Sequence, residues 1–214
     1  MVLSDEKIRA YMKRLLLSRM RILLHNGFYG LLLMHMVYAI DENCETAATD
    51  GRRIFFGPKF LDELDDRELD FIMMHEILHV VLRHCFRQGD RDNERFNIAC
   101  DIVVNSNILL SESMDPKAIT LQKYGESMHL APDGKEGCAY TVEQVYNMLP
   151  PCADRKSKPG LKQSKPKNAG AVWDDHTRWG MDAENEALRD VWTKRFEDAC
   201  AAVSIRDPSG QNGC

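Results

Sequence analysis

A helix that is apolar except for three residues at its centre constrains this chain most. Between residues 71 and 81 every side chain is apolar except those of His75, Glu76 and His79, and the helical spacing of apolar residues continues on both sides. Burying such a helix requires partners for two imidazole rings and a carboxylate, because buried polar atoms without partners are costly. The segment therefore predicts a fold in which these three side chains share a common partner.

The two ends of this helix are marked as well. Asp65 and Glu68 have the spacing of a capping box, with Asp65 as the N-cap residue. The apolar periodicity continues to about Gln88, and Gly89 follows as a C-terminal stop signal. The pattern predicts one continuous helix over this whole stretch.

The spacing of His75 and His79 suits a metal ion. Residues four apart on a helix lie about 40° apart around the axis, one turn along, so both rings can bind one ion. Glu76 lies roughly 100° round the helix from His75, which places its carboxylate to act on a water molecule rather than to bind the ion. The alternative is a pair of core histidines hydrogen-bonded to neighbours, with Glu76 paired to a basic residue.

A third ligand has to come from another element, and Asp101 is the first candidate. It lies on a predicted helix over 93–110, joined to the first by the short connection 89–92, and an antiparallel pair brings it level with the histidines. Asn97 and Asn105 extend a polar stripe through it on an otherwise apolar helix. The alternative for this stripe is a solvated face.

Two further histidines compete for roles at this site. His176 lies in the segment 172–179, which also contains two Trp and two Asp residues, and it is a possible additional active-site residue or the third ligand. His84 follows His75 by nine residues. On a continuous helix it points to the opposite side, and residues 80–83 offer no glycine to break the helix, so His84 is expected to be a structural or surface histidine.

The rest of the pattern predicts an α+β fold. Residues 31–40 and 53–56 read as two strands of an antiparallel hairpin, around a turn signal at 49–51. Amphipathic helices are expected over 4–24 and 183–203. Together they predict a small antiparallel sheet packed on a helical body that contains the site helix.

The expected organisation is one core with a loop and a tail. Residues 1–149 form the predicted core. A flexible basic loop over 150–170 separates it from a Trp/His segment and C-terminal helix over 171–204, which pack back on the core. Residues 205–214 are expected to be a disordered tail.

Charge, cysteine content and the length of the apolar stretches argue against several other classes of protein. The 214-residue chain has a formal charge of −5, and the run 154–168 has six basic residues and one acidic residue, which leaves −10 on the rest. This balance, without aromatic residues in the basic run, predicts no nucleic-acid binding. Seven scattered cysteines without a C-x-x-C pair predict reduced thiols and a cytoplasmic location. The longest apolar stretch, 28–40, is too short to span a membrane.

Four segments together resemble a bacterial and phage metallopeptidase-domain family that commonly precedes a von Willebrand factor A-like domain. They are TDGRR at 49–53, MHEILHVVLRH at 74–84, FNIACDIVVN at 96–105 and DDHTRW at 174–179. The resemblance covers roughly residues 10–200. It implies a zincin-like domain, a peptide or protein substrate, and a separate von Willebrand factor A-like or ATPase partner. Asp101 is similar to the acidic third ligand of related zinc enzymes.

The sequence therefore predicts a cytoplasmic, zinc-dependent metallopeptidase with one Zn²⁺ held by His75, His79 and Asp101. Glu76 is the predicted general base. The strand at 53–56 is expected to line the cleft and pair with an extended substrate. The alternative is a zinc-stabilised module that binds a protein partner and cleaves nothing.

Overall fold

The computed structural model describes residues 3–111, 128–151 and 185–206, and the chain divides into two compact units. The first unit comprises residues 1–86 and 173–214, and the second comprises residues 87–172. Over the described residues the fold is α+β, mostly helical with one small sheet, as the sequence predicts. In the described parts of the chain, no helix combines the length and the apolar character needed to cross a membrane.

The first unit begins with two consecutive helices, α1 (Asp5–His25) and α2 (Gly27–Leu33). Asn26 separates them: its backbone N–H bonds back into α1, and its side-chain oxygen accepts a hydrogen bond from the N–H of Tyr29. The prediction of a strand from residue 31 onward is therefore wrong in its first half. Asn26 is a good helix N-cap, and the leucines after it have high helix propensity, so the apolar run folds as a helix first.

The sheet has three short strands, β1 (Val37–Ile40), β2 (Ala47–Thr49) and β3 (Arg53–Phe56), in the order β1-β3-β2. β2 and β3 are antiparallel, whereas β1 and β3 are parallel, so the sheet is mixed. The predicted antiparallel hairpin between 31–40 and 53–56 is thus wrong. At the tight turn at Gly51, where φ is 83°, the chain reverses, so β2 pairs antiparallel with β3. Strand β1 then pairs with the opposite edge of β3.

This strand order also corrects the expected role of residues 53–56. β3 is the central strand and forms ladders with both neighbours, so its backbone groups on both sides are engaged. An extended peptide can add only to an edge strand, because only there are backbone donors and acceptors available. Residues 53–56 therefore cannot pair with a substrate backbone.

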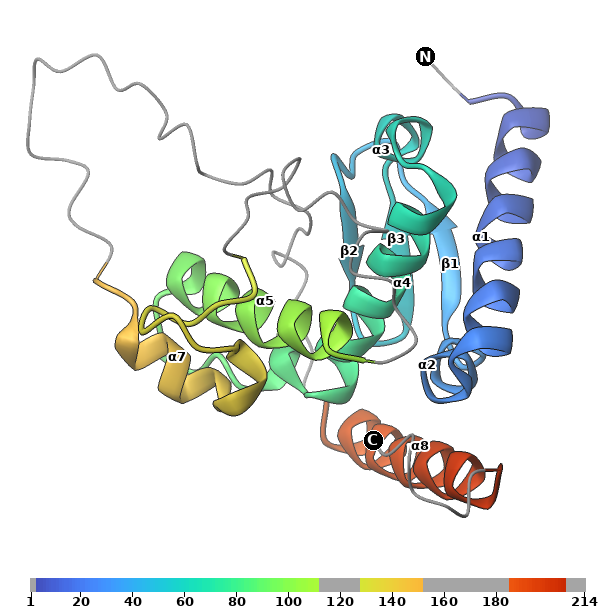
Figure 1. The fold of residues 1–214 in the computed structure, drawn as a ribbon. Helices are drawn as coiled ribbons and strands as arrows, with labels where there is room; N and C mark the ends of the chain where they lie inside the picture. Colours follow the sequence, from blue (N-terminus) through green and yellow to red (C-terminus); the bar gives the residue numbers. More distant parts are fainter. Residues whose placement is uncertain (1–2, 112–127, 152–184, 207–214) are drawn as a thin grey trace, which may run out of the picture. The chain divides into compact units, whose positions relative to one another are not determined.

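The site helix α4 (Asp66–Val81) follows the short helix α3 (Pro58–Glu63) and is buried along nearly its whole length. It packs against α1, α2, β2 and the C-terminal helix α8 (Asn185–Arg206), all within the first unit (Figure 1). A helix that is apolar all round needs such neighbours on every side. The core of this unit therefore forms around α4.

The helix α8 packs on the first unit through aromatic side chains. Phe196 meets Phe28 edge to face, with ring centroids 5.6 Å apart. Trp192 is 1% exposed. The helix predicted over 183–203 is thus present with slightly shifted ends, and Trp192 is its fully buried anchor on the first unit.

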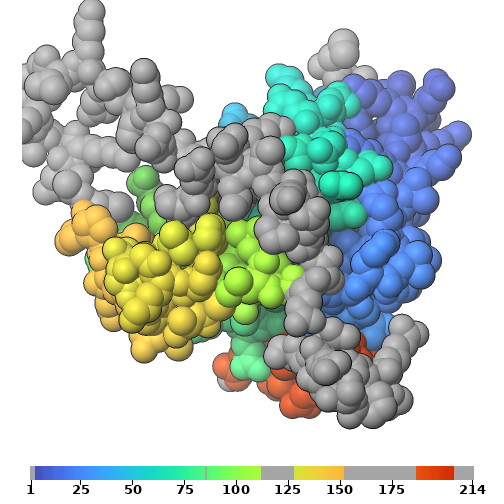
Figure 2. All heavy atoms as spheres, in the orientation of Figure 1, coloured from blue at the N-terminus to red at the C-terminus, as the bar shows by residue number. Residues whose placement is uncertain are grey.

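The second unit is built on α5 (Asn93–Leu109), with a 3-10 turn η3 (Gly137–Ala139) and the short helix α7 (Val142–Met148) packed on it. In the space-filling view, residues 128–151 (yellow to orange) lie directly against α5 (green) (Figure 2). The approach is close at Gly137, where a Cβ atom would stand 2.5 Å from the carbonyl oxygen of Ile102. Thr141 and Gln144 form a capping box at the start of α7.

Several expectations concern residues outside the described ranges. His176, nearly all of the 150–170 loop and most of the tail over 205–214 belong to this group. The expected domain organisation therefore stays a prediction.

Candidate metal centre

The start of α4 is fixed by the capping box that the sequence predicts. Oδ1 of Asp65 accepts hydrogen bonds from the backbone N–H groups of Arg67 and Glu68, both at 2.8 Å. Oε2 of Glu68 in turn accepts from the N–H of Asp65 at 2.8 Å. The first turn is thus closed on both sides, which sets the phase of the helix and hence the direction of the side chains that follow.

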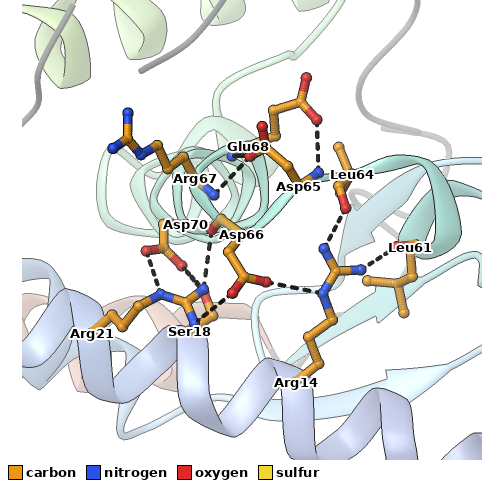
Figure 3. Close-up of polar contacts among 10 residues, drawn as sticks. All are labelled: Arg14, Ser18, Arg21, Leu61, Leu64, Asp65, Asp66, Arg67, Glu68 and Asp70. Carbon is orange, nitrogen blue, oxygen red and sulfur yellow. Dashed lines mark hydrogen bonds and ion pairs between the residues drawn. The ribbon is translucent and has the colours of Figure 1, made fainter. Parts of the chain in front are cut away.

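Helix α1 holds this first turn in place (Figure 3). Arg21 donates from Nη2 and Nε to the two carboxylate oxygens of Asp70, at 2.6 and 3.0 Å, and Ser18 donates to the same carboxylate at 2.5 Å. The hydrogen bonds to Asp70 raise the pKa of Arg21 above its usual value. Because Arg21 is half-buried, this bidentate pair fixes the rotation of α4 against α1.

Arg14 of α1 secures the connection between α3 and α4. Its guanidinium donates to the backbone carbonyl groups of Leu61 and Leu64, at the C-terminal end of α3, and to a carboxylate oxygen of Asp66 (Figure 3). Carbonyl groups at the end of a helix lack partners within the helix. One side chain therefore satisfies this end and fixes the point at which α4 begins.

His75 and His79 lie side by side in the buried part of α4. Their exposed fractions are 1% and 0%, and their Nε2 atoms are 2.9 Å apart, with ring centroids 4.5 Å apart. Glu76 is also fully buried. The structure thus brings together the two nitrogen atoms that the sequence predicts as ligands, on a helix that places Glu76 next to them.

The helix ends earlier than the sequence predicts, and this changes the position of His84. α4 stops at Val81, Arg83 adopts a left-handed conformation with φ of 59°, and a 3-10 turn η1 (His84–Phe86) follows. His84 is fully buried, and its Nδ1 atom lies 3.1 Å from Nδ1 of His79. The prediction of a continuous helix to Gln88 is therefore wrong.

The corner at Arg83 is tied to a distant part of the chain. Arg83 is not a residue that usually ends a helix, because a left-handed backbone strains any side chain with a Cβ atom. Its guanidinium donates to the hydroxyl of Thr193 on α8, which lies 110 positions later in the chain. This contact ties the corner at Arg83 to α8. No residue pattern near Arg83 predicts that the helix ends there.

The donor set of His75 and His79 fits one divalent metal ion. Two nitrogen ligands bonded to zinc at about 2.0–2.1 Å are about 2.9 Å apart at a right angle and about 3.4 Å at the tetrahedral angle. The observed separation of 2.9 Å lies in this span. Two imidazoles are ligand types that zinc commonly binds in hydrolases.

The predicted third ligand, Asp101, belongs to the second unit. It lies on α5, which begins at Asn93 as predicted and is capped by Asp92, and it is half-buried. Asn105, one turn later, is 2% exposed and donates to the backbone carbonyl of Met128 at 3.1 Å. The polar stripe of α5 is thus partly turned inward. The role of Asp101 as a metal ligand stays a prediction.

The second unit also contains a polar cluster that the sequence analysis missed. Oε2 of Glu136 accepts a hydrogen bond from the hydroxyl of Ser106 at 2.8 Å and lies 3.0 Å from Nδ1 of His129. Burial raises the pKa of Glu136, but the hydrogen bonds from His129 and Ser106 outweigh burial and lower the pKa overall. Ser106 lies 30 positions before Glu136 and His129 lies seven positions before it, so no motif within one helix or strand connects the three residues.

One comparison with known proteins finds a match. The sequence pattern of a protein family described as "Putative metallopeptidase domain" matches residues 10–193. No curated protein and no solved structure matches the chain. The match covers most of the chain and includes α4 with its two histidines, α5 and part of α8. This chain therefore belongs to the metallopeptidase-domain family that this description names.

Proposed function

We propose that this chain is a zinc-dependent peptidase in which His75, His79 and Asp101 hold the ion and Glu76 is the general base. The observation that carries the proposal is the pair of buried Nε2 atoms 2.9 Å apart on α4. Membership in a metallopeptidase-domain family supports it. Among the residues that the structure describes, these two histidines and Asp101 each offer one ligand atom suited to a divalent ion.

The chain's own residues have distinct tasks in this proposal. When bound, a divalent ion supplies Lewis-acid chemistry, which polarises a carbonyl group and acidifies water. The carboxylate of Glu76 accepts the proton of the water that attacks the peptide carbonyl and passes that proton to the leaving nitrogen. Because Glu76 is fully buried, bulk water does not compete with the reacting water for its carboxylate.

The substrate class, the fold type and the cellular location are proposed from the sequence alone. The proposed substrate is a peptide or a protein, and the proposed fold type is zincin-like. The proposed cytoplasmic location follows from the cysteine pattern. His176 is a possible additional active-site residue outside the described ranges, and a von Willebrand factor A-like or ATPase partner stays a prediction.

The test combines metal analysis with hydrolysis of a mixed library of internally quenched peptides. We expect the wild-type protein to bind about one zinc ion per chain, and to lose hydrolysis with a chelator and regain it with zinc. Glu76→Gln should abolish hydrolysis and keep the ion. Glu63→Gln, the same change at an exposed position on α3, should behave like the wild type.

Three outcomes decide between the alternatives. A wild-type protein that takes up no zinc would contradict the whole proposal, and Glu76→Gln with normal hydrolysis would contradict the role of Glu76. Zinc that is bound tightly without hydrolysis of any library member favours the other candidate, a zinc-stabilised module that binds a protein partner.

A further inference from the structure

The contact between His79 and His84 joins the two histidines of the site to a third one. Nδ1 of His84 lies 3.1 Å from Nδ1 of His79, and Nε2 of His79 lies 2.9 Å from Nε2 of His75. The rings of His79 and His84 meet nearly edge to face, with an interplanar angle of 75°. All three side chains are at most 1% exposed, so bulk water does not compete for these contacts.

A hydrogen bond between two imidazole nitrogens needs one proton, and its position has consequences for metal binding. A neutral imidazole carries one proton, on either Nδ1 or Nε2. If His79 carries it on Nδ1, it donates to His84, and its Nε2 lone pair faces His75 and is available to an ion. If His84 is the donor, the proton of His79 sits on Nε2 instead, where it blocks that nitrogen as a ligand.

We propose that His84 is the positioning residue of the metal centre: its Nδ1 accepts the Nδ1–H of His79 and so keeps Nε2 of His79 ready to bind the ion. This inference rests on the metal site proposed above. Histidine ligands in metalloproteins generally donate their second ring N–H to an acceptor that fixes the tautomer and the ring orientation. Here that acceptor is a ring nitrogen of His84, 3.1 Å from Nδ1 of His79.

The backbone corner after α4 makes this arrangement possible. If the helix continued, His84 would lie about 140° around the axis from His79 and out of reach of its ring. The helix ends at Val81 instead, and the left-handed backbone of Arg83 turns the chain back toward the site. The contact of Arg83 with Thr193 ties this corner to α8. The left-handed backbone at Arg83 is thus the point at which the chain turns so that His84 can contact His79.

The first experiment measures zinc affinity by competition with a chromophoric chelator. His84→Leu removes the acceptor, and we expect zinc affinity to fall by about 10–100-fold. His84→Asn keeps an oxygen acceptor near the place of Nδ1 and should recover most of that loss. His25→Asn, the same change at an exposed histidine on α1, should leave the affinity unchanged.

The comparison of the two His84 variants separates positioning from packing. A merely structural role predicts that both variants weaken the fold and that Asn, the smaller and more polar side chain, gives no rescue. Equal zinc affinity in His84→Leu and the wild type would overturn the inference while leaving the proposed function intact. A wild-type protein that binds no zinc would instead contradict the proposed function itself.

A second measurement uses the wild-type protein and does not depend on the folding of any variant. In protein labelled with ¹⁵N-histidine, nuclear magnetic resonance reports which ring nitrogen of each histidine carries the proton. Without metal, we expect the proton on Nδ1 of His79 and a scalar coupling across the hydrogen bond to an unprotonated Nδ1 of His84. A proton on Nδ1 of His84, or on Nε2 of His79, would overturn the inference.

Discussion

The indole N–H of Trp192 donates a hydrogen bond to the backbone carbonyl of Gly51 at 2.8 Å, across 141 positions of sequence. Gly51 lies in the turn between β2 and β3, so the C-terminal helix α8 fixes one end of the sheet. The same helix holds Arg83 through Thr193. One late segment of the chain thus fixes both the sheet and the corner after the site helix.

Replacing Trp192 with Phe should destabilise the first unit by about 1–3 kcal/mol. The change leaves the carbonyl of Gly51 without its indole donor and replaces a fully buried ring by a smaller one. Urea unfolding followed by circular dichroism measures the difference. Val191→Ala, at a neighbouring exposed position of α8, should change the free energy of unfolding by less than about 0.5 kcal/mol. Equal effects of the two changes would contradict this account of how α8 docks.

The identity of the third metal ligand can be decided by zinc content after dialysis. Asp101→Ala should lower zinc occupancy strongly, because a site with two ligands holds the ion far less tightly than one with three. His176→Ala should keep the ion if His176 acts on the substrate instead. Asp90→Ala removes an exposed carboxylate of the same unit and is the control. Loss of zinc in His176→Ala alone would reverse the assignment.

The anchoring of α4 on α1 should depend on Asp70 more than on exposed ion pairs. Asp70→Asn removes the charge that binds Arg21 and accepts from Ser18, and we expect a loss of about 1–3 kcal/mol in the free energy of unfolding. The exposed pair of Lys7 with Asp62 joins the same helix to α3, and Lys7→Met should change stability little. Thermal unfolding of both variants gives the comparison, and a larger effect of Lys7→Met would be evidence against this ranking.

The second unit should lose protection in acid because of Glu136. Its pKa is lowered in the folded state from the usual 4.5, so it stabilises the fold above about pH 4.5, and this contribution is lost as the pH falls through the folded value. Hydrogen exchange of the α5 amides should therefore be faster in Glu136→Gln than in the wild type at pH 7. The difference should shrink below about pH 4.5. Glu94→Gln, at an exposed position of α5, should show no such pH dependence. If the difference between Glu136→Gln and the wild type grew as the pH fell, the expected direction of the pH dependence would be wrong.

Local signals in the sequence predict the helix starts well. Asp65 caps α4 as its spacing from Glu68 indicates, and α1 and α5 begin close to the predicted residues 4 and 93, because helix-start signals involve only residues within about one turn of each other. The pairing of His75 with His79 is local in the same sense, since the helix itself brings residues four apart together.

Where long-range contacts decide the outcome, the sequence prediction fails. The apolar residues from 31 onward suit a strand or a helix equally, and the cap at Asn26 together with packing on α1 makes their first part helical. The parallel pairing of β1 with β3 depends on which edge of β3 is already taken by β2. No pattern within either strand contains that information.

The sequence by itself determined the helix that carries the site, the side-by-side placement of His75 and His79, and the adjacent carboxylate of Glu76. These features depend on helical periodicity and on caps, which act over a few residues. Only the tertiary structure decided where that helix ends and that His84 returns to His79, because the corner at Arg83 is held by Thr193 from the far end of the chain. A backbone conformation that is strained locally persists when distant contacts offset its cost, and those contacts exist only once the chain has folded.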